Sequence, residues 1–159
     1  MDHLSKFENF LTVAEIDIVR RSFLNLGDEN ARAGELFYQQ LFDDKPELKS
    51  LFLSDISVQS EKLTNMLGMI VSQIHNMPEL LPMLADLARR HLGYGVEAEH
   101  YRDVGDALIS TIRDVLGPKF GPDVEAAWTK AYEGIALTMI QCCYGRAGIE
   151  KYEMARTHD

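Results

Sequence analysis

The chain has 159 residues, of which 46% are hydrophobic and 26% are charged, and its formal net charge is −9. This length is typical of one domain, and the hydrophobic content is too high for a disordered chain. The acidic balance argues against binding to nucleic acid or to an anionic membrane, because both depend on Lys and Arg side chains that neutralise phosphate.

The spacing of apolar residues predicts helices, and two of them lie in the first third of the chain. Apolar residues recur three and four positions apart along most of the chain, so we expect an all-α fold. The segment 12–15 (TVAE) matches a capping box, and a first helix should follow it as far as Gly27. A second helix can be capped by Asp28 or Asn30, and it must end or bend at Lys45-Pro46, since a residue before proline avoids the helical region.

The remaining helices follow from prolines and glycines. After a turn-rich stretch, a long helix is expected from about Ser57 and should stop before Pro78. Pro82 suits the first turn of the next helix, which the GYG run at 93–95 should end. Two further helices are predicted at about 97–116 and from about 122 through 139.

We expect a single domain over residues 1–159, with a core at about 12–144 and short flexible tails. The two cysteines, Cys142 and Cys143, are adjacent, and Cα atoms about 3.8 Å apart lie below the usual disulfide range. Such a pair can bind a soft metal or respond to redox state, but small buried apolar side chains are the favoured interpretation. We expect a cytoplasmic protein for three reasons. The thiols should be reduced, the start MDHLSKFENF lacks the basic and then apolar order of a signal peptide, and no apolar run is long enough to span a membrane.

Of the five histidines, His91 is the one whose spacing predicts a place in the core. It shares a helix face with Leu84 and Leu87, at spacings of seven and four, so its ring should point inward. Spacing alone favours a core histidine that is satisfied by a backbone carbonyl. A tetrahedral zinc site would need further protein ligands nearby, whereas a lone inward histidine suits a metal whose other ligands come with a cofactor, as in heme.

Two more polar residues occur among apolar neighbours. Tyr38 follows the pair Leu36-Phe37, and Gln59 lies one turn before Leu63. Taken singly, each is most often a surface side chain, and only the combination with His91 favours a functional site. Because no nucleophile elbow, phosphate loop or paired carboxylate motif occurs, a hydrolase or a kinase has no support.

The order of these residues resembles a globin, in particular the bacterial single-domain hemoglobins and the heme domain of flavohemoglobins, over about residues 13–144. The matching positions are Phe37-Tyr38, Pro46, Leu51-Phe52, the runs 59–63 and 87–91, Gly95-Val96, Tyr101, Val104-Gly105, and 126–128 with Tyr132. The resemblance implies the globin fold, in which helices cross at about 50° around a heme pocket. Here about six long helices plus short turns would form it.

The resemblance also implies the roles of the site residues. His91 would bind the iron of heme b, and Lys62 and Arg90 would reach the heme propionates. The distal side, where a gas binds, would be lined by Tyr38, Gln59 and Leu63. The full set of residues expected at the cofactor is Phe52, Lys62, Leu63, Leu87, Arg90, His91, Val96, Tyr101 and Val104.

We therefore expect reversible binding of oxygen, nitric oxide or another diatomic gas by ferrous iron, as a store, carrier or scavenger. Gln59 occupies the position of a distal histidine and is a poor iron ligand, which predicts five-coordinate ferrous heme. Alternatives are nitric oxide dioxygenation with a separate reductase, and a heme-free signalling module with the globin fold. No catalytic residue is assigned, and both a monomer and a homodimer remain open.

One departure limits the enzymatic alternative. In flavohemoglobins the proximal histidine is linked to a tyrosine and a glutamate, and Tyr101 matches that tyrosine. Alignment on Trp128 places Cys143 where the glutamate should be. Because a thiol does not supply the same anionic electron donation, we expect weaker support here for peroxidase-like or optimised dioxygenase chemistry.

Overall fold

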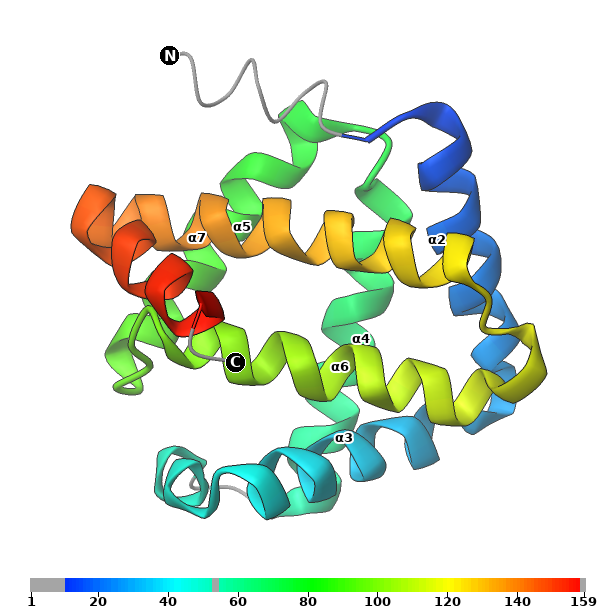
Figure 1. The fold of residues 1–159 in the computed structure, drawn as a ribbon, viewed down its shortest axis with the longest axis horizontal. Helices are drawn as coiled ribbons and strands as arrows, with labels where there is room; N and C mark the ends of the chain where they lie inside the picture. The colour runs from blue at the N-terminus through cyan, green and yellow to red at the C-terminus, as the bar shows by residue number, and fades with distance from the viewer. Residues whose placement is uncertain (1–10, 53–54, 158–159) are drawn as a thin grey trace.

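The computed structural model describes residues 11–52 and 55–157, and all regular structure in these ranges is helical. This confirms the predicted all-α class. The elements, shown in Figure 1, are α2 (Val13–Leu26), η1 (Gly27–Glu29), α3 (Asn30–Asp44), η2 (Pro46–Leu51), α4 (Ile56–Gln73), α5 (Met77–Gly93), α6 (His100–Leu116), η3 (Gly117–Lys119) and α7 (Pro122–Thr157). No helix in the described ranges is long and apolar enough to cross a membrane.

The capping box at the start of α2 is confirmed. The Thr12 hydroxyl accepts a hydrogen bond from the Glu15 amide at 3.1 Å, and the Glu15 carboxylate accepts one from the Thr12 amide at 2.8 Å. Two amides that would lack partners in the first turn are thereby satisfied. Gly27 ends the helix with a φ of 45°, a conformation that glycine adopts without steric cost.

Two predicted helix starts were wrong. Helix α3 has Glu29 as its N-cap, without a side-chain capping bond, because the 3-10 turn η1 runs directly into the helix. Helix α5 begins at Met77, so the first turn contains Pro78, and Pro82 lies inside the helix. The interior proline removes one backbone hydrogen bond, but the helix is held by the full burial of Leu80 and Leu84.

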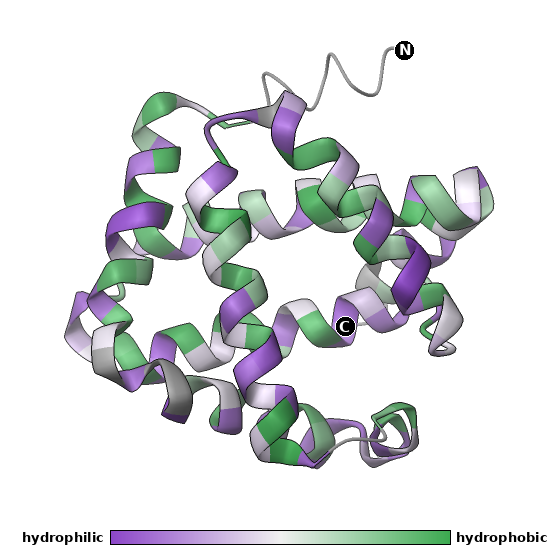
Figure 2. Ribbon diagram, turned by 180° about the vertical axis from the view of Figure 1, so that it is seen from behind, coloured by the Kyte–Doolittle hydropathy of each residue, from purple (hydrophilic) through white to green (hydrophobic). Residues whose placement is uncertain are grey.

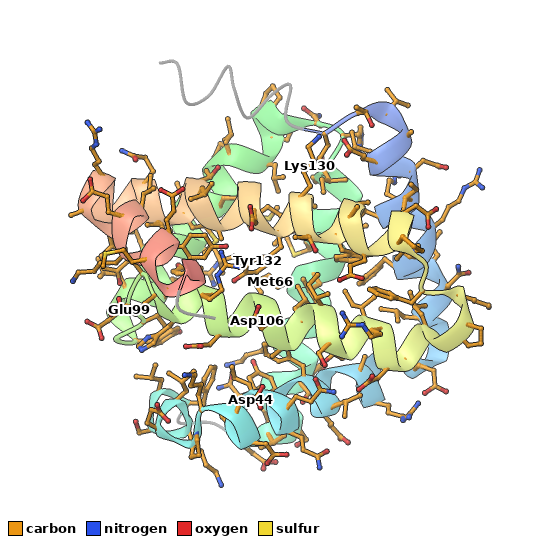
Figure 3. The ribbon with its side chains drawn as sticks, viewed as in Figure 1. Asp44, Met66, Glu99, Asp106, Lys130 and Tyr132 are labelled. Carbon is orange, nitrogen blue, oxygen red and sulfur yellow. The ribbon has the colours of Figure 1, made fainter. Side chains whose placement is uncertain are left out.

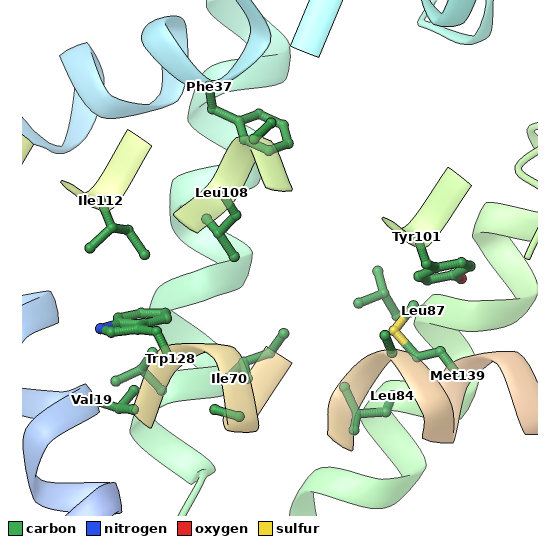
Figure 4. Packing of buried hydrophobic residues seen from close by; sticks show 14 of the residues in the cluster. Val19, Phe37, Ile70, Leu84, Leu87, Tyr101, Leu108, Ile112, Trp128 and Met139 are labelled. Carbon is green, nitrogen blue, oxygen red and sulfur yellow. The ribbon is translucent and has the colours of Figure 1, made fainter. Parts of the chain in front are cut away.

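The helices enclose one connected core. Figure 1 shows α6 and α7 running side by side, with α4 crossing behind them and α3 below α6, while α5 packs against α7. Along the helices, hydrophobic and hydrophilic residues alternate in the pattern expected for amphipathic helices (Figure 2). In the close-up of the core, Phe37 and Trp128 lie in one group of buried side chains, and Leu87 and Tyr101 lie in another (Figure 4).

Close approach between α3 and α4 places the residues of the candidate distal side. A Cβ atom added at Gly34 would lie 2.9 Å from the Cβ of Ser60, so only glycine allows this crossing without displacement. Gly34 lies one turn before Tyr38, and Ser60 directly follows Gln59. The crossing therefore fixes the backbone of both candidate ligand-binding residues with respect to each other.

The C-terminal part of α7 differs from the expected flexible tail. Gly145 interrupts the helix with a φ of 63° and a ψ of −155°, and the residues after it are helical again up to Thr157. Tyr152 in this part is only 2% exposed. The burial of this aromatic ring explains why residues beyond Tyr144 are held in place.

Candidate functional site

The ring of His91 is held in an orientation that suits a metal ligand. His91 Nδ1 lies 2.8 Å from the carbonyl oxygen of Leu87, one turn earlier on α5. A carbonyl only accepts hydrogen bonds, so Nδ1 carries the proton and the lone pair of Nε2 remains available. Burial lowers the pKa of His91, although the bond to Leu87 opposes that shift, and the imidazole is therefore neutral at pH 7.

The surroundings of His91 are formed by the chain that follows it. The Tyr101 ring lies 6.3 Å from the His91 ring, between centroids, at an interplanar angle of 25°. The amide of Val96 donates a hydrogen bond to the His91 carbonyl at 3.1 Å. Burial raises the pKa of Tyr101 well above its usual value, and the neighbouring Tyr144 and Cys143 raise it further.

Tyr38 is buried in an aromatic cluster, with an exposed fraction of 5%. Its ring centroid lies 4.9 Å from Phe37, 5.8 Å from Phe42 and 5.2 Å from Phe52. Within the described part of the chain its hydroxyl has no hydrogen-bond partner. Burial raises the pKa of Tyr38 to about 12, so the hydroxyl is neutral and can donate a hydrogen bond to a ligand.

The other predicted site residues fall into two groups. The half-buried residues are Gln59 and Leu63 on α4, Val104 on α6, Val96 before α6, and Phe52 after η2. Lys62 and Arg90 are exposed, and Arg90 pairs with Asp86 at 3.1 Å. The structure thus places the Tyr38 ring against the Phe52 ring, and it places His91 in contact with Leu87, Val96 and Tyr101.

Sequence reasoning missed the polar contacts that α7 makes around His91. The Tyr144 hydroxyl donates to the Val96 carbonyl, and the Tyr132 hydroxyl donates to the Tyr101 carbonyl at 2.5 Å. Figure 3 labels Tyr132 on α7. Both tyrosines share the helical spacing of the apolar residues of α7, and that spacing predicts that their rings pack in the core. The spacing does not show which carbonyl each hydroxyl will reach.

Comparison with known proteins decides the family. The model of the family named Globin matches residues 35–139. This chain belongs to the globin family. A flavohemoprotein of Bacillus subtilis is 31% identical over 145 residues, which cover 88% of this chain and 35% of that protein. A flavohemoprotein of Chromobacterium violaceum is 36% identical over 107 residues, which cover 65% of this chain and 26% of that protein.

This globin also matches solved structures. An engineered carbene transferase, derived from a candidate nitric oxide dioxygenase of Rhodothermus marinus, superposes on this chain with a TM-score of 0.74 at 25% sequence identity. The match covers 93% of this chain and 98% of that chain. The globin fold that the resemblance implied is confirmed, as is the relationship to the heme part of flavohemoproteins. This chain spans about a third of the length of the flavohemoproteins of Bacillus subtilis and Vibrio cholerae.

The donor groups of this globin fit a heme. Among the described residues, no three His, Cys, Asp or Glu side chains converge to hold a metal ion. A single neutral imidazole with a free Nε2 therefore matches an iron whose other four ligands come from a porphyrin.

Proposed function

We propose that this globin binds heme b through His91 Nε2 and reversibly binds oxygen or another diatomic gas on the side of Tyr38 and Gln59. The orientation of His91 carries the proposal. Its Nδ1 proton is bound to Leu87, so Nε2 is the nitrogen available for iron. Stacking on Tyr101 limits rotation of the imidazole ring.

The remaining cofactor residues supply contact area and charge. Phe52, Leu63 and Val104 present half-buried apolar side chains that would pack against a porphyrin. Arg90 would turn from Asp86 toward a propionate, since an exposed ion pair of this kind is worth only about 0–1 kcal/mol. When bound, heme supplies an iron with one coordination position open to a gas.

Tyr38 and Gln59 would determine how tightly the gas is held. A hydroxyl or amide that donates to a ligand with partial negative charge contributes about 1.5–3 kcal/mol. Tyr38 is suited to this role because its side chain is largely buried and its hydroxyl is neutral and without a competing partner in the described residues. The Gln59 amide is a poor ligand for iron, so the ferrous form without added gas should be five-coordinate.

Absorption spectroscopy tests the proposal. Purified protein reconstituted with heme should show a Soret band near 400 nm, which His91→Ala should lose or shift. His91→Gly should regain the band when imidazole is added, because free imidazole can occupy the space of the missing ring. His75→Ala is the matched control, since His75 is exposed. A wild-type protein that takes up no heme would overturn the proposal and favour the heme-free signalling module.

Nitric oxide dioxygenation is a second candidate, supported by the similarity to flavohemoproteins and to the Rhodothermus marinus protein. This role would require electrons from a reductase. Mixing the oxygenated protein with nitric oxide, in the presence and absence of a flavin reductase, separates the two candidates. Repeated turnover supports the enzyme, and a single oxidation without re-reduction supports gas binding alone.

A further inference from the structure

The C-terminal residues 146–157 turn back onto the body of the molecule. The turn is made at Gly145, whose φ of 63° favours glycine. At Gly148 an added Cβ atom would lie 2.3 Å from the Cβ of Tyr144, so the returning chain closely contacts the part of α7 before Gly145. In Figure 1 this segment, in red, lies beside the start of α6.

Tyr152 anchors the returning segment on α6. Its ring is 2% exposed, and the guanidinium carbon of Arg102 lies 4.4 Å above the ring centroid. Arg102 is itself largely buried and lies 3.7 Å from the carboxylate of Glu133 on α7. A cation over an aromatic face, partly removed from water, attracts more strongly than an exposed pair. The contact therefore fixes the residue directly after Tyr101.

Tyr144 connects the part of α7 before Gly145 to the segment that follows His91. Its hydroxyl donates to the Val96 carbonyl, and the Val96 amide donates to the His91 carbonyl. Burial raises the pKa of Tyr144, and the nearby Cys143 and Glu97 raise it further, so the hydroxyl stays protonated and can donate. Two hydrogen bonds thus link α7 to the backbone of His91.

We infer that Tyr144 and residues 146–157 form a brace that positions His91 for iron. The brace acts on both ends of the connection between α5 and α6: through Tyr144 at Val96, and through Tyr152 and Arg102 beside Tyr101. Within the brace, Tyr144 and Tyr152 are the positioning residues, because they act through His91 and Tyr101. The inference rests on the proposed function for its consequence, but the brace itself can be tested without heme.

Hydrogen exchange in the heme-free protein tests whether the brace holds the connection. In Tyr152→Ala and in Tyr144→Phe, the amides of residues 94–101 should exchange roughly three- to tenfold faster, as expected for the loss of one net interaction. Amides of α2 should be unchanged. Lys151→Ala is the matched control, because Lys151 is an exposed neighbour on the same turn. Tyr144→Phe keeps the ring, so it remains informative if Tyr152→Ala does not fold.

Resonance Raman spectroscopy of the ferrous, heme-loaded protein tests the consequence for iron. The stretching band of the bond between iron and His91 should shift and broaden in Tyr144→Phe and Tyr152→Ala, and transfer of heme to an acceptor apoprotein should accelerate by about three- to tenfold. Both should be unchanged in Lys151→Ala. A loss of general stability alone would not move the band.

The two proposals can fail separately. If wild-type protein binds no heme while exchange of residues 94–101 responds to Tyr144→Phe, the proposed function fails and the brace stands as a structural device. If wild-type protein binds heme, and Tyr144→Phe and Tyr152→Ala match Lys151→Ala in exchange, Raman band and heme transfer, the brace is refuted.

Discussion

Removal of the Tyr38 hydroxyl should weaken ligand binding and leave protein stability nearly unchanged. Tyr38→Phe keeps the ring and its contacts with Phe37, Phe42 and Phe52. Only the hydroxyl is lost, and in the described residues this group has no partner although the side chain is 5% exposed. The variant therefore separates the polar contribution of Tyr38 from its packing.

The magnitude follows from what the hydroxyl does in each state. Because the Tyr38 hydroxyl makes no hydrogen bond within the described residues, its loss should leave the free energy of unfolding of the heme-free protein unchanged to within about 1 kcal/mol. With a gas bound, the variant loses a hydrogen bond to a polarised ligand, worth about 1.5–3 kcal/mol. Oxygen release should then be about 10- to 150-fold faster.

Stopped-flow measurement of oxygen release and urea unfolding of the heme-free protein provide the two readouts. Tyr94→Phe is the matched control, because Tyr94 is 65% exposed. Since the pKa of Tyr38 is raised to about 12, its hydroxyl still donates at pH 10, and slow release should persist there; it should be lost only as the pH rises through about 12. An unchanged rate of oxygen release in Tyr38→Phe would refute the distal assignment. A large loss of stability would show that the Tyr38 hydroxyl has a hydrogen-bond partner in the heme-free protein.

Three further substitutions test the packing that supports the site. Gly105→Ala places a Cβ atom 2.5 Å from a ring carbon of Tyr132, and urea unfolding should show a loss of about 1–3 kcal/mol. Gly68→Ala, whose nearest contact is an ordinary 3.8 Å, should instead be neutral or gain about 0.5–1 kcal/mol. Ser22→Ala leaves the indole nitrogen of Trp128 without the acceptor now at 2.7 Å, so thermal unfolding should show a loss of about 1–3 kcal/mol; an unaltered midpoint would count against that bond.

Sequence patterns predicted helix ends correctly where the signal lies within one turn of the helix end. The capping box at Thr12 and the end of the first helix at Gly27 involve residues within one turn of each other, and both predictions were confirmed. The prediction that Pro82 lies in the first turn of its helix was wrong, because Pro78, four residues earlier, fits the same local rule. Burial of the helix against α7 decided between them.

The candidate site was predictable in part for the same reason. The inward direction of His91 follows from its spacing to Leu87, and the structure adds the hydrogen bond between the two. The iron-binding role of His91 and the distal role of Tyr38 remain predictions that the spectra above will test. The exposure of Arg90 and its pairing with Asp86 could not be foreseen from a resemblance, since surface charges pair with whatever lies one turn away.

The sequence by itself determined that this chain is helical, where most helices end, and that His91 faces inward, because these properties depend on neighbours within one or two turns. Only the tertiary structure decided that Tyr144 reaches the carbonyl of Val96, 48 residues away, and that Tyr152 folds back onto Arg102. Such contacts depend on how whole helices pack, and a periodic pattern shows only which face is buried and not what will lie against it.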